Sequence, residues 1–498
     1  EEDGLPVVGA SVLVKGTTTG TVTDMDGKFT LTNVPSSAKT LMISFIGMKT
    51  VEIGIAPQLT VYLKTDSETL DEVMVVAYGS AKKSSFTGSA ANIDQKKLEL
   101  RPITNVTKGL EGQSTGILTT SGSGQPGSSA SIVIRGFGSI NASSNPLYVV
   151  DGVPFDGSLS SINPADIESM TVLKDASAGA LYGARGANGV VMITTKGGKE
   201  GKANVTWRST VGWSSRALDE YDMVDGKDYV QLTYEAIRNS YIFNNGYAWA
   251  DAEAQARKDL SGNLGGELYN PFKNYTWDTI IDPATGMVRP DAQAAWDERW
   301  MDALQRDDAL RHEHQLAIKG GTDKTKYMFS LGYLNEDGIL VTTGFQRYSA
   351  RANVNSKITH WFQANANLSL SNSVQNFSDY SGSSTSNVWY SAQFVSPLFP
   401  VYIKDMQGNS VLDEFGKPQL DYGEQGRPGS YNDYNPLGGL LDDIADVKND
   451  VAGLRTGMTF GSDEESMGIF QGLKLALNFG ADYRSQLQKS YMNMYHGN

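Results

Sequence analysis

Apolar and polar residues alternate in long stretches between residues 203 and 484, and this period of two most constrains the fold. In 203–213, valine or tryptophan occupies positions 205, 207, 211 and 213, and polar residues occupy 204, 206, 208 and 210. The alternation recurs over 326–334, 347–355, 361–373, 451–460 and 473–483. Successive side chains of a strand point to opposite faces. The pattern therefore predicts antiparallel β-strands that each have one apolar and one polar face.

Strand and loop lengths favour a membrane-spanning sheet. Several alternating segments run to about 10 residues, the length that a tilted strand needs to cross a bilayer, and aromatic residues lie near their ends, as in an interfacial girdle. Connections are short at 319–324, 355–359 and 461–468 but very long at 214–311 and 374–449, with 336–344 as the exception. Transmembrane barrels have short periplasmic turns and long outer loops. A β-barrel is predicted, and a water-soluble β-protein stays open as the alternative.

The number of strands predicts an incomplete barrel. We count seven, the last ending near residue 484, whereas plugged barrels of the large transporter class have about 22. An open sheet would expose an unpaired edge to lipid. We therefore expect the remaining strands to come from a longer sequence or from a second chain.

Composition excludes several classes of function. The formal net charge is −14, whereas a nucleic-acid partner requires a basic face. There is no cysteine, so neither disulfides nor thiolate metal sites can form. No stretch reaches the roughly 18 apolar residues of a membrane helix. No secretory signal is present at the start of the sequence, and we expect any signal to have been removed.

The first 66 residues predict a small β-sandwich. Short strands are expected within the segments 8–16, 20–24, 28–34, 40–48 and 59–64, at the spacing typical of such folds. The sequence Asp24-Met25-Asp26-Gly27 could begin a calcium loop, but the rest of the 12-residue loop is missing. A hairpin turn at Asp26-Gly27 is favoured instead.

Residues 81–202 predict a mixed α/β domain rich in glycine. The stretch 122–127 formally matches the dinucleotide fingerprint G-x-G-x-x-G, but no clear strand precedes it and Pro126 stands where a helix should begin, so nucleotide binding is not expected. Asn163 and Pro164 predict the cap and first turn of a short helix that a strand follows. A buried strand is predicted over Val190–Thr195.

Candidate catalytic and metal-binding residues are few. His312 and His314 would share one face of a strand, but two ligands do not make a metal site. The motifs H-E-x-x-H and G-x-S-x-G are absent from the sequence. We therefore predict no enzyme, no metal site and no cofactor. An amphipathic helix over 291–306, with Trp296 and Trp300 on one face, is expected to pack against its own loop or, alternatively, to contact a lid protein or ligand.

A β-prone apolar strip lies between the first two domains, where a polar linker is usual. In Leu70–Lys83, Val73 to Tyr78 are apolar or aromatic and have no evident partner strand beside them in the sequence. An unpaired strand of this kind is a template to which another protein can add its own strand. The alternative is that 70–78 forms the last strand of the first domain.

Three groups of motifs together resemble the SusC/RagA-type TonB-dependent outer-membrane transporters. Residues 5–64, with "GLPVVGASVLVKGTTTGTVTDMDGKFTL" and "SFIGMKT", resemble the carboxypeptidase-regulatory-like domain of that family. "LDEVMVVAYG" resembles its TonB box. "IRGFGSINASSNPLYVVDGVP" and "INPADIESMTVLKDASAGALYGARGANGVVMITTKGG" resemble its plug domain.

The resemblance implies a mainly β fold in four parts. These are a carboxypeptidase-regulatory-like β-sandwich (1–66), the TonB box and linker (67–80), a mixed α/β plug (81–202) and the first strands of a large plugged transmembrane antiparallel barrel (203–498). The box is expected to face the periplasm, with the barrel in the bacterial outer membrane.

The resemblance also implies partners and ligand. TonB would bind Asp71, Glu72, Val73, Met74, Val75, Val76, Ala77 and Tyr78. A SusD-like lipoprotein would close over the barrel. Glycan oligosaccharides are the expected cargo, and peptides or a metal chelate are the alternative. A protein of another class, which binds ligand at the surface without transport, is the remaining interpretation. Ligand contacts are expected in a plug loop that comprises Gly138, Ser139, Ile140, Asn141, Ala142, Ser143, Ser144 and Asn145.

Overall fold

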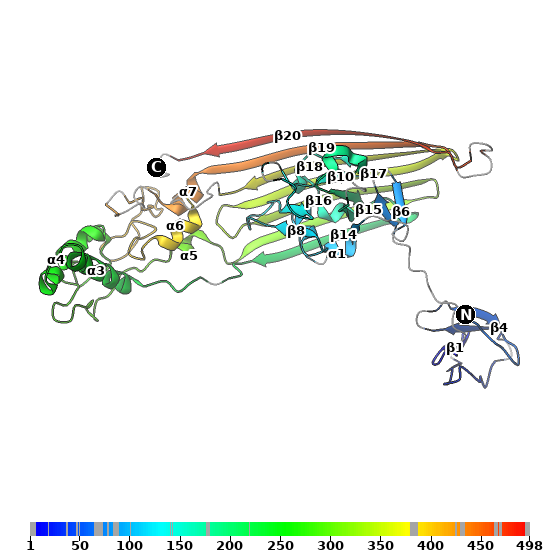
Figure 1. Ribbon diagram of the computed structural model, residues 1–498, viewed down its shortest axis with the longest axis horizontal. Helices are drawn as coiled ribbons and strands as arrows, with labels where there is room; N and C mark the ends of the chain where they lie inside the picture. The colour runs from blue at the N-terminus through cyan, green and yellow to red at the C-terminus, as the bar shows by residue number, and fades with distance from the viewer. Residues whose placement is uncertain are drawn as a thin grey trace. The chain divides into compact units, whose positions relative to one another are not determined.

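The chain divides into two compact units, Glu1–Thr87 and Gly88–Asn498. The computed structural model describes residues 6–17, 19–35, 38–45, 48, 50–63, 73–76, 79–82, 89–99, 101–139, 141, 143–175, 180–218, 220–378, 387–423, 426–428, 434–462, 467 and 471–493. Strands are the dominant regular structure in both units (Figure 1), which confirms the mainly β fold.

The first unit contains a four-stranded antiparallel sheet in the order β2-β1-β3-β4. Its strands are β1 (Ser11–Val14), β2 (Gly20–Val22), β3 (Thr40–Ser44) and β4 (Val51–Gly54). The strands predicted over 28–34 and 59–64 are wrong for the residues that the structure describes, 28–34 and 59–63, because no strand forms there. Their apolar side chains instead cover the sheet, which provides the second layer without ladder hydrogen bonds: Phe29, Leu31, Val34, Leu59, Val61 and Leu63.

The turn at Asp26-Gly27 is confirmed. A carboxylate oxygen of Asp24 accepts hydrogen bonds from the backbone N–H groups of Asp26 (3.0 Å) and Lys28 (2.8 Å). Gly27 has φ of +73°, a conformation that glycine adopts without steric cost. The aspartate thus stabilises its own turn.

The second unit begins with a region that we call the plug region, residues 89–200. Its five-stranded sheet has the order β11-β10-β13-β12-β7, with β7 (Ala90–Asp94), β10 (Leu147–Val150), β11 (Val153–Pro154), β12 (Ile167–Leu173) and β13 (Val190–Thr195). Only β10 and β13 pair in parallel. A separate hairpin joins β8 (Ile117–Thr120) to β9 (Ser131–Ile134).

Short helical segments complete the plug region. They are α1 (Gln95–Glu99), η2 (Val106–Leu110), η3 (Leu159–Ser161), η4 (Pro164–Asp166) and η5 (Ala180–Gly186). The Asn163 side chain caps η4 by accepting from the N–H of Ala165, and β12 follows at once. Both this short helical turn and the buried strand Val190–Thr195 therefore match the sequence-based prediction.

Seven long antiparallel strands form a second sheet, which we call the wall. They are β14 (Gly201–Ser214), β15 (Ala309–Gly321), β16 (Thr325–Asp337), β17 (Gly344–Thr359), β18 (Phe362–Asn376), β19 (Ile444–Phe460) and β20 (Leu475–Tyr491), paired in sequence order. The predicted number of strands is confirmed. The connections 322–324 and 360–361 are short, 215–308 and 377–443 are long, and 338–343 is the short exception at the long-loop end.

One face of the wall is apolar across all seven strands. Its central cross-strand row runs Trp207, Leu316, Leu331, Ala350, Leu370, Ala452 and Tyr483. Trp207 is 74% exposed and Tyr483 is 64% exposed. An exposed apolar surface that spans a whole sheet requires an apolar environment or partner. No helix in the described residues is both long and apolar enough to cross a membrane.

The described residues of the two long connections and of the short connection 338–343 fold into a packed structure that we call the loop lobe (215–308, 338–343 and 377–443). It contains α3 (Gly226–Phe243), α4 (Trp249–Asn263), η6 (Glu267–Tyr269), α5 (Trp300–Leu304), α6 (Val388–Phe394) and α7 (Pro436–Asp442). The lobe has its own apolar core, including Trp277, Trp300 and Leu398, and lies at one end of the wall strands (Figure 1).

The helix predicted over 291–306 is wrong in extent, because only Trp300–Leu304 is helical. Trp296 and Trp300 are both buried. Their indole N–H groups donate to the carbonyl oxygens of Leu398 and Phe399, both at 2.9 Å. These two hydrogen bonds reach the other long connection, 377–443, and not the loop that contains the tryptophans. Trp300 also belongs to an apolar core that includes Trp277 of its own loop, so the expected packing against that loop is confirmed only in part.

Candidate functional site

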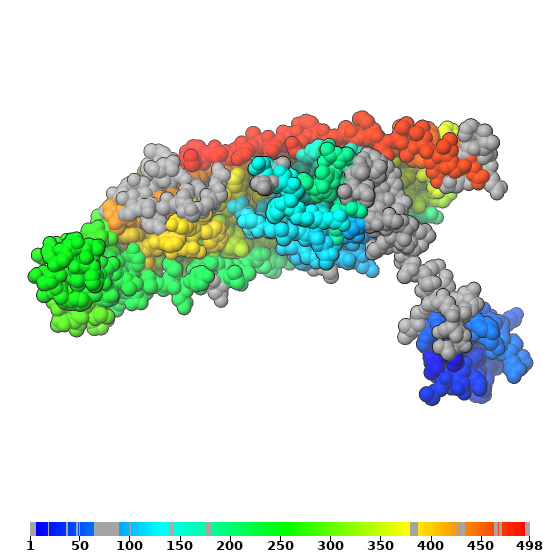
Figure 2. All heavy atoms as spheres, viewed as in Figure 1, coloured from blue at the N-terminus to red at the C-terminus, as the bar shows by residue number. Residues whose placement is uncertain are grey.

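The plug region lies against the polar face of the wall. In Figure 2 the cyan atoms of the plug region lie directly below the red atoms of β20. The residues opposite the exposed apolar rows point toward it, because side chains alternate along each strand. Hydrogen bonds from wall side chains to plug residues fix the contact, as the following groups show. This interface is the candidate functional site.

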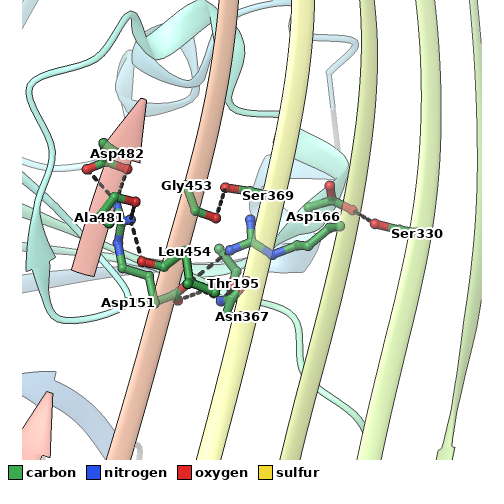
Figure 3. A network of polar contacts seen from close by, with 12 residues as sticks. Asp151, Asp166, Thr195, Ser330, Asn367, Ser369, Gly453, Leu454, Ala481 and Asp482 are labelled. Atoms are coloured by element: carbon green, nitrogen blue, oxygen red, sulfur yellow. Dashed lines mark hydrogen bonds and ion pairs between the residues drawn. The ribbon is translucent and has the colours of Figure 1, made fainter. Parts of the chain in front are cut away.

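Asp151 is the centre of the first group of contacts (Figure 3). It lies in the Asp151-Gly152 turn between β10 and β11, where both residues have positive φ (+48° and +84°), as a two-residue hairpin turn requires. Its carboxylate accepts from the N–H (2.9 Å) and hydroxyl (2.8 Å) of Thr195 within the plug region. From the wall it accepts from Arg351 Nη2 (2.8 Å) and Asn367 Nδ2. We call these four residues the Asp151 cluster.

Asn163 and Asp166, at the two ends of η4, make the second group. Asp166 is 4% exposed, and one of its oxygens accepts from Gln315 Nε2 (3.0 Å) and Ser330 Oγ (2.7 Å) of the wall. The Asn163 amide donates to Gln315 Oε1 (2.8 Å). The same asparagine that caps the helical turn thus also binds the wall. This buried carboxylate is stabilised by hydrogen bonds to neutral groups, and the charges of Lys196 and Arg347 also act on it.

Arg347 of β17 makes the third group and is 1% exposed. Its Nη1 donates to three backbone carbonyls of the plug region, those of Thr104 (2.9 Å), Ser160 (3.0 Å) and Ile162 (3.3 Å). One guanidinium therefore connects two separate plug segments, at Thr104 and at 160–162, because it carries several hydrogen-bond donors in a fixed planar arrangement. Thr104 also donates its hydroxyl to Glu336 of the wall.

The plug loop with the formal dinucleotide fingerprint contacts the wall as well. Gln375 Nε2 donates to the carbonyl of Pro126 at 2.7 Å. Gly127 has φ of +76°, and a side chain at this position would overlap the ring of Phe345. The strand β9, not a helix, follows the loop. Close approach to the wall therefore explains Gly127, whereas Gly122 and Gly124 have open space where a side chain would lie.

Glu99, at the end of α1, joins the plug region to β14. Its carboxylate accepts from Arg208 (2.9 Å) and lies 3.5 Å from Lys196 Nζ. Burial opposes ionisation of this carboxyl, but hydrogen bonds from Arg208 and Gln95 and the charges of Lys196 and Arg208 prevail and lower the pKa of Glu99 to about 2. Glu99 is therefore ionised wherever the unfolded chain, with an ordinary carboxyl pKa of 4.5, would be ionised.

This shift predicts a pH-dependent contribution to stability. A carboxyl whose pKa is lower in the folded state stabilises the fold above its unfolded pKa and loses that contribution as pH falls through the folded pKa. Replacing Glu99 with glutamine should therefore lower the urea midpoint of the detergent-purified full-length protein at pH 7. The difference from the unsubstituted protein should shrink from pH 4.5 toward pH 2. A difference that does not change over this window would contradict the assignment.

The two segments predicted to bind TonB and ligand lie elsewhere. Asp71, Glu72, Ala77 and Tyr78 lie outside the described residues. Val73–Val76 forms β5, which pairs antiparallel with β6 (Gly79–Lys82). The expectation that this strip has no partner strand nearby is therefore wrong. The small residues of 79–82 carried no strand signal, and the strip can form one hairpin with them.

The loop 138–145 is described except for Ile140 and Ala142. Gly138, Ser139, Asn141, Ser143 and Asn145 are exposed. The amide of Asn188 holds the loop by donating to the carbonyls of Ser143 (2.9 Å) and Asn145 (3.3 Å). These hydrogen bonds thus hold the loop in a defined conformation on the plug surface. Its role in ligand binding stays a prediction.

The histidine pair lies on the exposed face of the wall. His314 Nδ1 is 2.9 Å from Ser209 Oγ, and the ring of His314 stacks with that of Tyr333 at 6.4 Å between centroids. The rings of His312 and His314 are 5.5 Å apart. Among the described residues, no group of three or more histidine, aspartate or glutamate side chains is placed to hold a metal ion.

Known proteins resemble both the sequence and the fold. Residues 82–190 match the family model of the TonB-dependent receptor plug domain, and residues 1–75 match that of the CarboxypepD_reg-like domain. The chain is 32% identical to the TonB-dependent receptor SusC of Bacteroides thetaiotaomicron over 511 residues, which cover 99% of this chain and 44% of that protein. The chain contains a TonB-dependent receptor plug domain and resembles SusC over nearly its whole length.

Two further comparisons agree with the resemblance to SusC. The TonB-dependent receptor P3 of Formosa agariphila is 31% identical over 84% of this chain and 37% of its own length. The RagAB peptide importer in its open-open state has a TM-score of 0.61 and 26% identity over 83% of this chain and 42% of that chain. The chain thus spans less than half the length of these relatives. The resemblance to TonB-dependent receptors also agrees with the prediction that the chain is not an enzyme.

Sequence reasoning missed the residues by which this chain binds its plug to its wall. Arg347, Arg351 and Asn367 lie on strand faces that were correctly identified as polar, whereas no polar face was predicted for the strand of Gln315. The partners of all four lie between 149 and 243 residues away in the sequence. The sequence feature that could have indicated these contacts is the presence of arginine on the polar strand faces. A cation on a face that should line an enclosed space requires a buried partner.

Proposed function

We propose that the protein imports polar oligomers across the bacterial outer membrane, with energy delivered by TonB. The observation that carries the proposal is the polar plug–wall interface. Hydrogen bonds contribute about 0.5–1.5 kcal/mol each in net terms, because water can replace them. A contact built from such bonds can be opened and rehydrated, whereas separating an apolar core would expose surface at a cost of about 25 cal/mol per Å².

The position of β7 supports a mechanical link. Residues 71–78, the proposed TonB box, precede β7 by about a dozen residues of chain, and β7 is the edge strand of the plug sheet, paired only with β12. Force applied at the box therefore enters the plug at an edge strand. The adjacent β12 begins directly after Asp166, whose wall contacts are described above. We propose that pulling disturbs β7 and β12 first and that the wall contacts follow.

The cargo and the partner protein are also proposals. We propose oligosaccharide as cargo on the family resemblance, and peptide as the alternative, which the similarity to the RagAB peptide importer favours. A SusD-like lipoprotein is proposed as the partner that covers the loop lobe. Any such cargo is a chain of neutral groups that donate and accept hydrogen bonds, which suits the amide and hydroxyl side chains of the inner wall face.

Uptake by intact cells tests the proposal. Cells that produce the full-length protein should accumulate a labelled oligosaccharide or a labelled peptide of equal length, and an uncoupler that collapses the proton gradient should reduce uptake to the level of cells without the protein. Native mass spectrometry of the purified complex should show bound mass in hexose or amino-acid steps. Uptake that continues unchanged without the proton gradient would contradict energy-coupled import.

A further inference from the structure

A cavity of about 230 Å³ lies between the plug region and the wall, next to the Asp151 cluster. Asp151 and Thr195 line it from the plug region. The wall contributes five asparagines to its lining: Asn353, Asn355, Asn365, Asn367 and Asn478. Carboxamides both donate and accept hydrogen bonds and carry no charge. Five of the nine wall residues that line the cavity therefore carry amides.

Strand register brings these amides together. Asn355 pairs with Asn365, which pairs with Gly457, which pairs with Asn478. The neighbouring row contains Asn353, Asn367 and Arg455. A Cβ at position 457 would collide with Asn365 Oδ1 and would lie 2.9 Å from Asn478 Oδ1. The glycine therefore leaves the space in which the two amides face the cavity.

Two buried polar atoms that line the cavity lack partners among the described residues. They are Asn367 Oδ1 and Arg455 Nε, in residues that are 5% and 7% exposed. A buried polar atom without a hydrogen-bond partner destabilises the structure. The first atom accepts a hydrogen bond and the second donates one. A hydroxyl group or a peptide unit that enters the cavity can satisfy both.

The charges around the cavity are mostly compensated. Arg455 pairs with Asp482 at 2.7 Å, and Asp151 pairs with Arg351 at 2.8 Å. Glu168 and Lys326 add one charge of each sign to the lining. A site without net charge and with many amides suits neutral polar ligands, not anions or cations.

The cavity also lies toward one end of the wall. Gly198 and Lys326 line it, and Lys326 follows the short connection 322–324. The loop lobe lies at the other end of the strands. Since barrels have short turns on the periplasmic side, this end faces the periplasm in the proposed function.

We propose that the amide-lined cavity is the exit site of the import path. A neutral oligomer, whose hydroxyl or peptide groups exchange hydrogen bonds with the asparagines, leaves between the plug and strands β17–β20 once the Asp151 cluster opens. The proposal rests on the proposed function and adds the route and the chemistry of the last step. The two sources of the shared ligand chemistry, sugar and peptide, are separated in the test.

A single introduced thiol tests this exit site, because the chain has no cysteine. In the full-length protein, Asn365→Cys places the thiol in the cavity, and Ala366→Cys places it on the opposite face of the same strand. After labelling with a small polar maleimide, uptake of a labelled oligosaccharide and of a peptide of equal length is measured separately. Surface binding of each is measured in uncoupled cells.

Labelling of the Asn365→Cys variant should lower uptake of the transported class at least tenfold and leave surface binding unchanged, while labelling of the Ala366→Cys variant should change neither. Normal uptake after complete labelling of Asn365→Cys would overturn the exit site, as would a thiol at position 365 that does not react. A block for one cargo class identifies that class as the ligand. If the protein without substitution or label imports neither cargo, the proposed function itself is wrong. This result is distinct from a failure of the exit site alone.

Discussion

Replacing Asp151 with asparagine is expected to lower the free energy of unfolding of the second unit by about 3–5 kcal/mol, because the buried guanidinium of Arg351 then has no counter-charge. The side chains of Asp151 and Arg351 are 17% and 8% exposed. Asparagine retains the shape of the side chain and tolerates the positive φ of this position. The decrease in the free energy of unfolding therefore measures the effect of removing the charge and not an effect of backbone strain. Urea denaturation of the detergent-purified full-length protein measures it.

Asp156→Asn is the matched control. Asp156 lies in the same plug region and pairs with Arg185, but both side chains are more than half exposed, so its removal should cost at most about 1 kcal/mol. The double variant Asp151→Asn with Arg351→Met should recover part of the loss, since no buried charge is then left alone. Equal costs at 151 and 156 would show that the Asp151 cluster does not hold the plug to the wall.

Local sequence patterns were sufficient to predict the wall and much of the plug. The alternation of Ala350 and Ala352 with Arg351 and Asn353 follows directly from strand geometry, and the structure has this division of faces. The Asn163 cap and the strand Val190–Thr195 were equally local features. Such elements are predictable because their main determinant is the burial of one face, and residues close together in the sequence determine which face is buried.

Features that depend on distant residues were not predictable. Asp151 and Arg351 are 200 residues apart, and nothing local marks them as partners. The helix predicted around Trp296 is shorter because the indole groups are held by carbonyls of Leu398 and Phe399, about 100 residues away. Tertiary contacts here override helical spacing. The pairing of β5 with β6 was missed for another reason, namely that Gly79–Lys82 has no β-prone residues.

The Asp151 cluster and the amide-lined cavity share residues, and this sharing has a mechanical consequence. Asp151, Thr195 and Asn367 belong to both. If the cluster opens, the Asn367 amide loses its hydrogen bond to Asp151. All its donors and acceptors can then bind a ligand in the cavity. Release of the plug would thus increase the affinity of the exit site for a polar ligand at the moment when the ligand arrives.

Replacing Asp71–Tyr78 by a Gly/Ser segment of equal length is expected to reduce uptake to the level of uncoupled cells while ligand binding at the surface stays unchanged. The replaced residues belong to the first unit, whereas the plug region, wall and loop lobe belong to the second. The substitution therefore leaves the proposed import path intact and removes only the strand to which TonB would add. Uptake and binding of the same labelled cargo are measured in parallel.

A single substitution separates strand addition from the loss of side chains. Strand addition depends on main-chain hydrogen bonds, and proline lacks the N–H group. Val75→Pro should therefore lower uptake nearly as far as the segment replacement, whereas Val75→Thr, which keeps a β-branched side chain and the N–H, should lower it far less. If threonine and proline had equal effects, side-chain contacts would dominate. If neither variant nor the segment replacement lowered uptake, residues 71–78 would not be the TonB-binding strand.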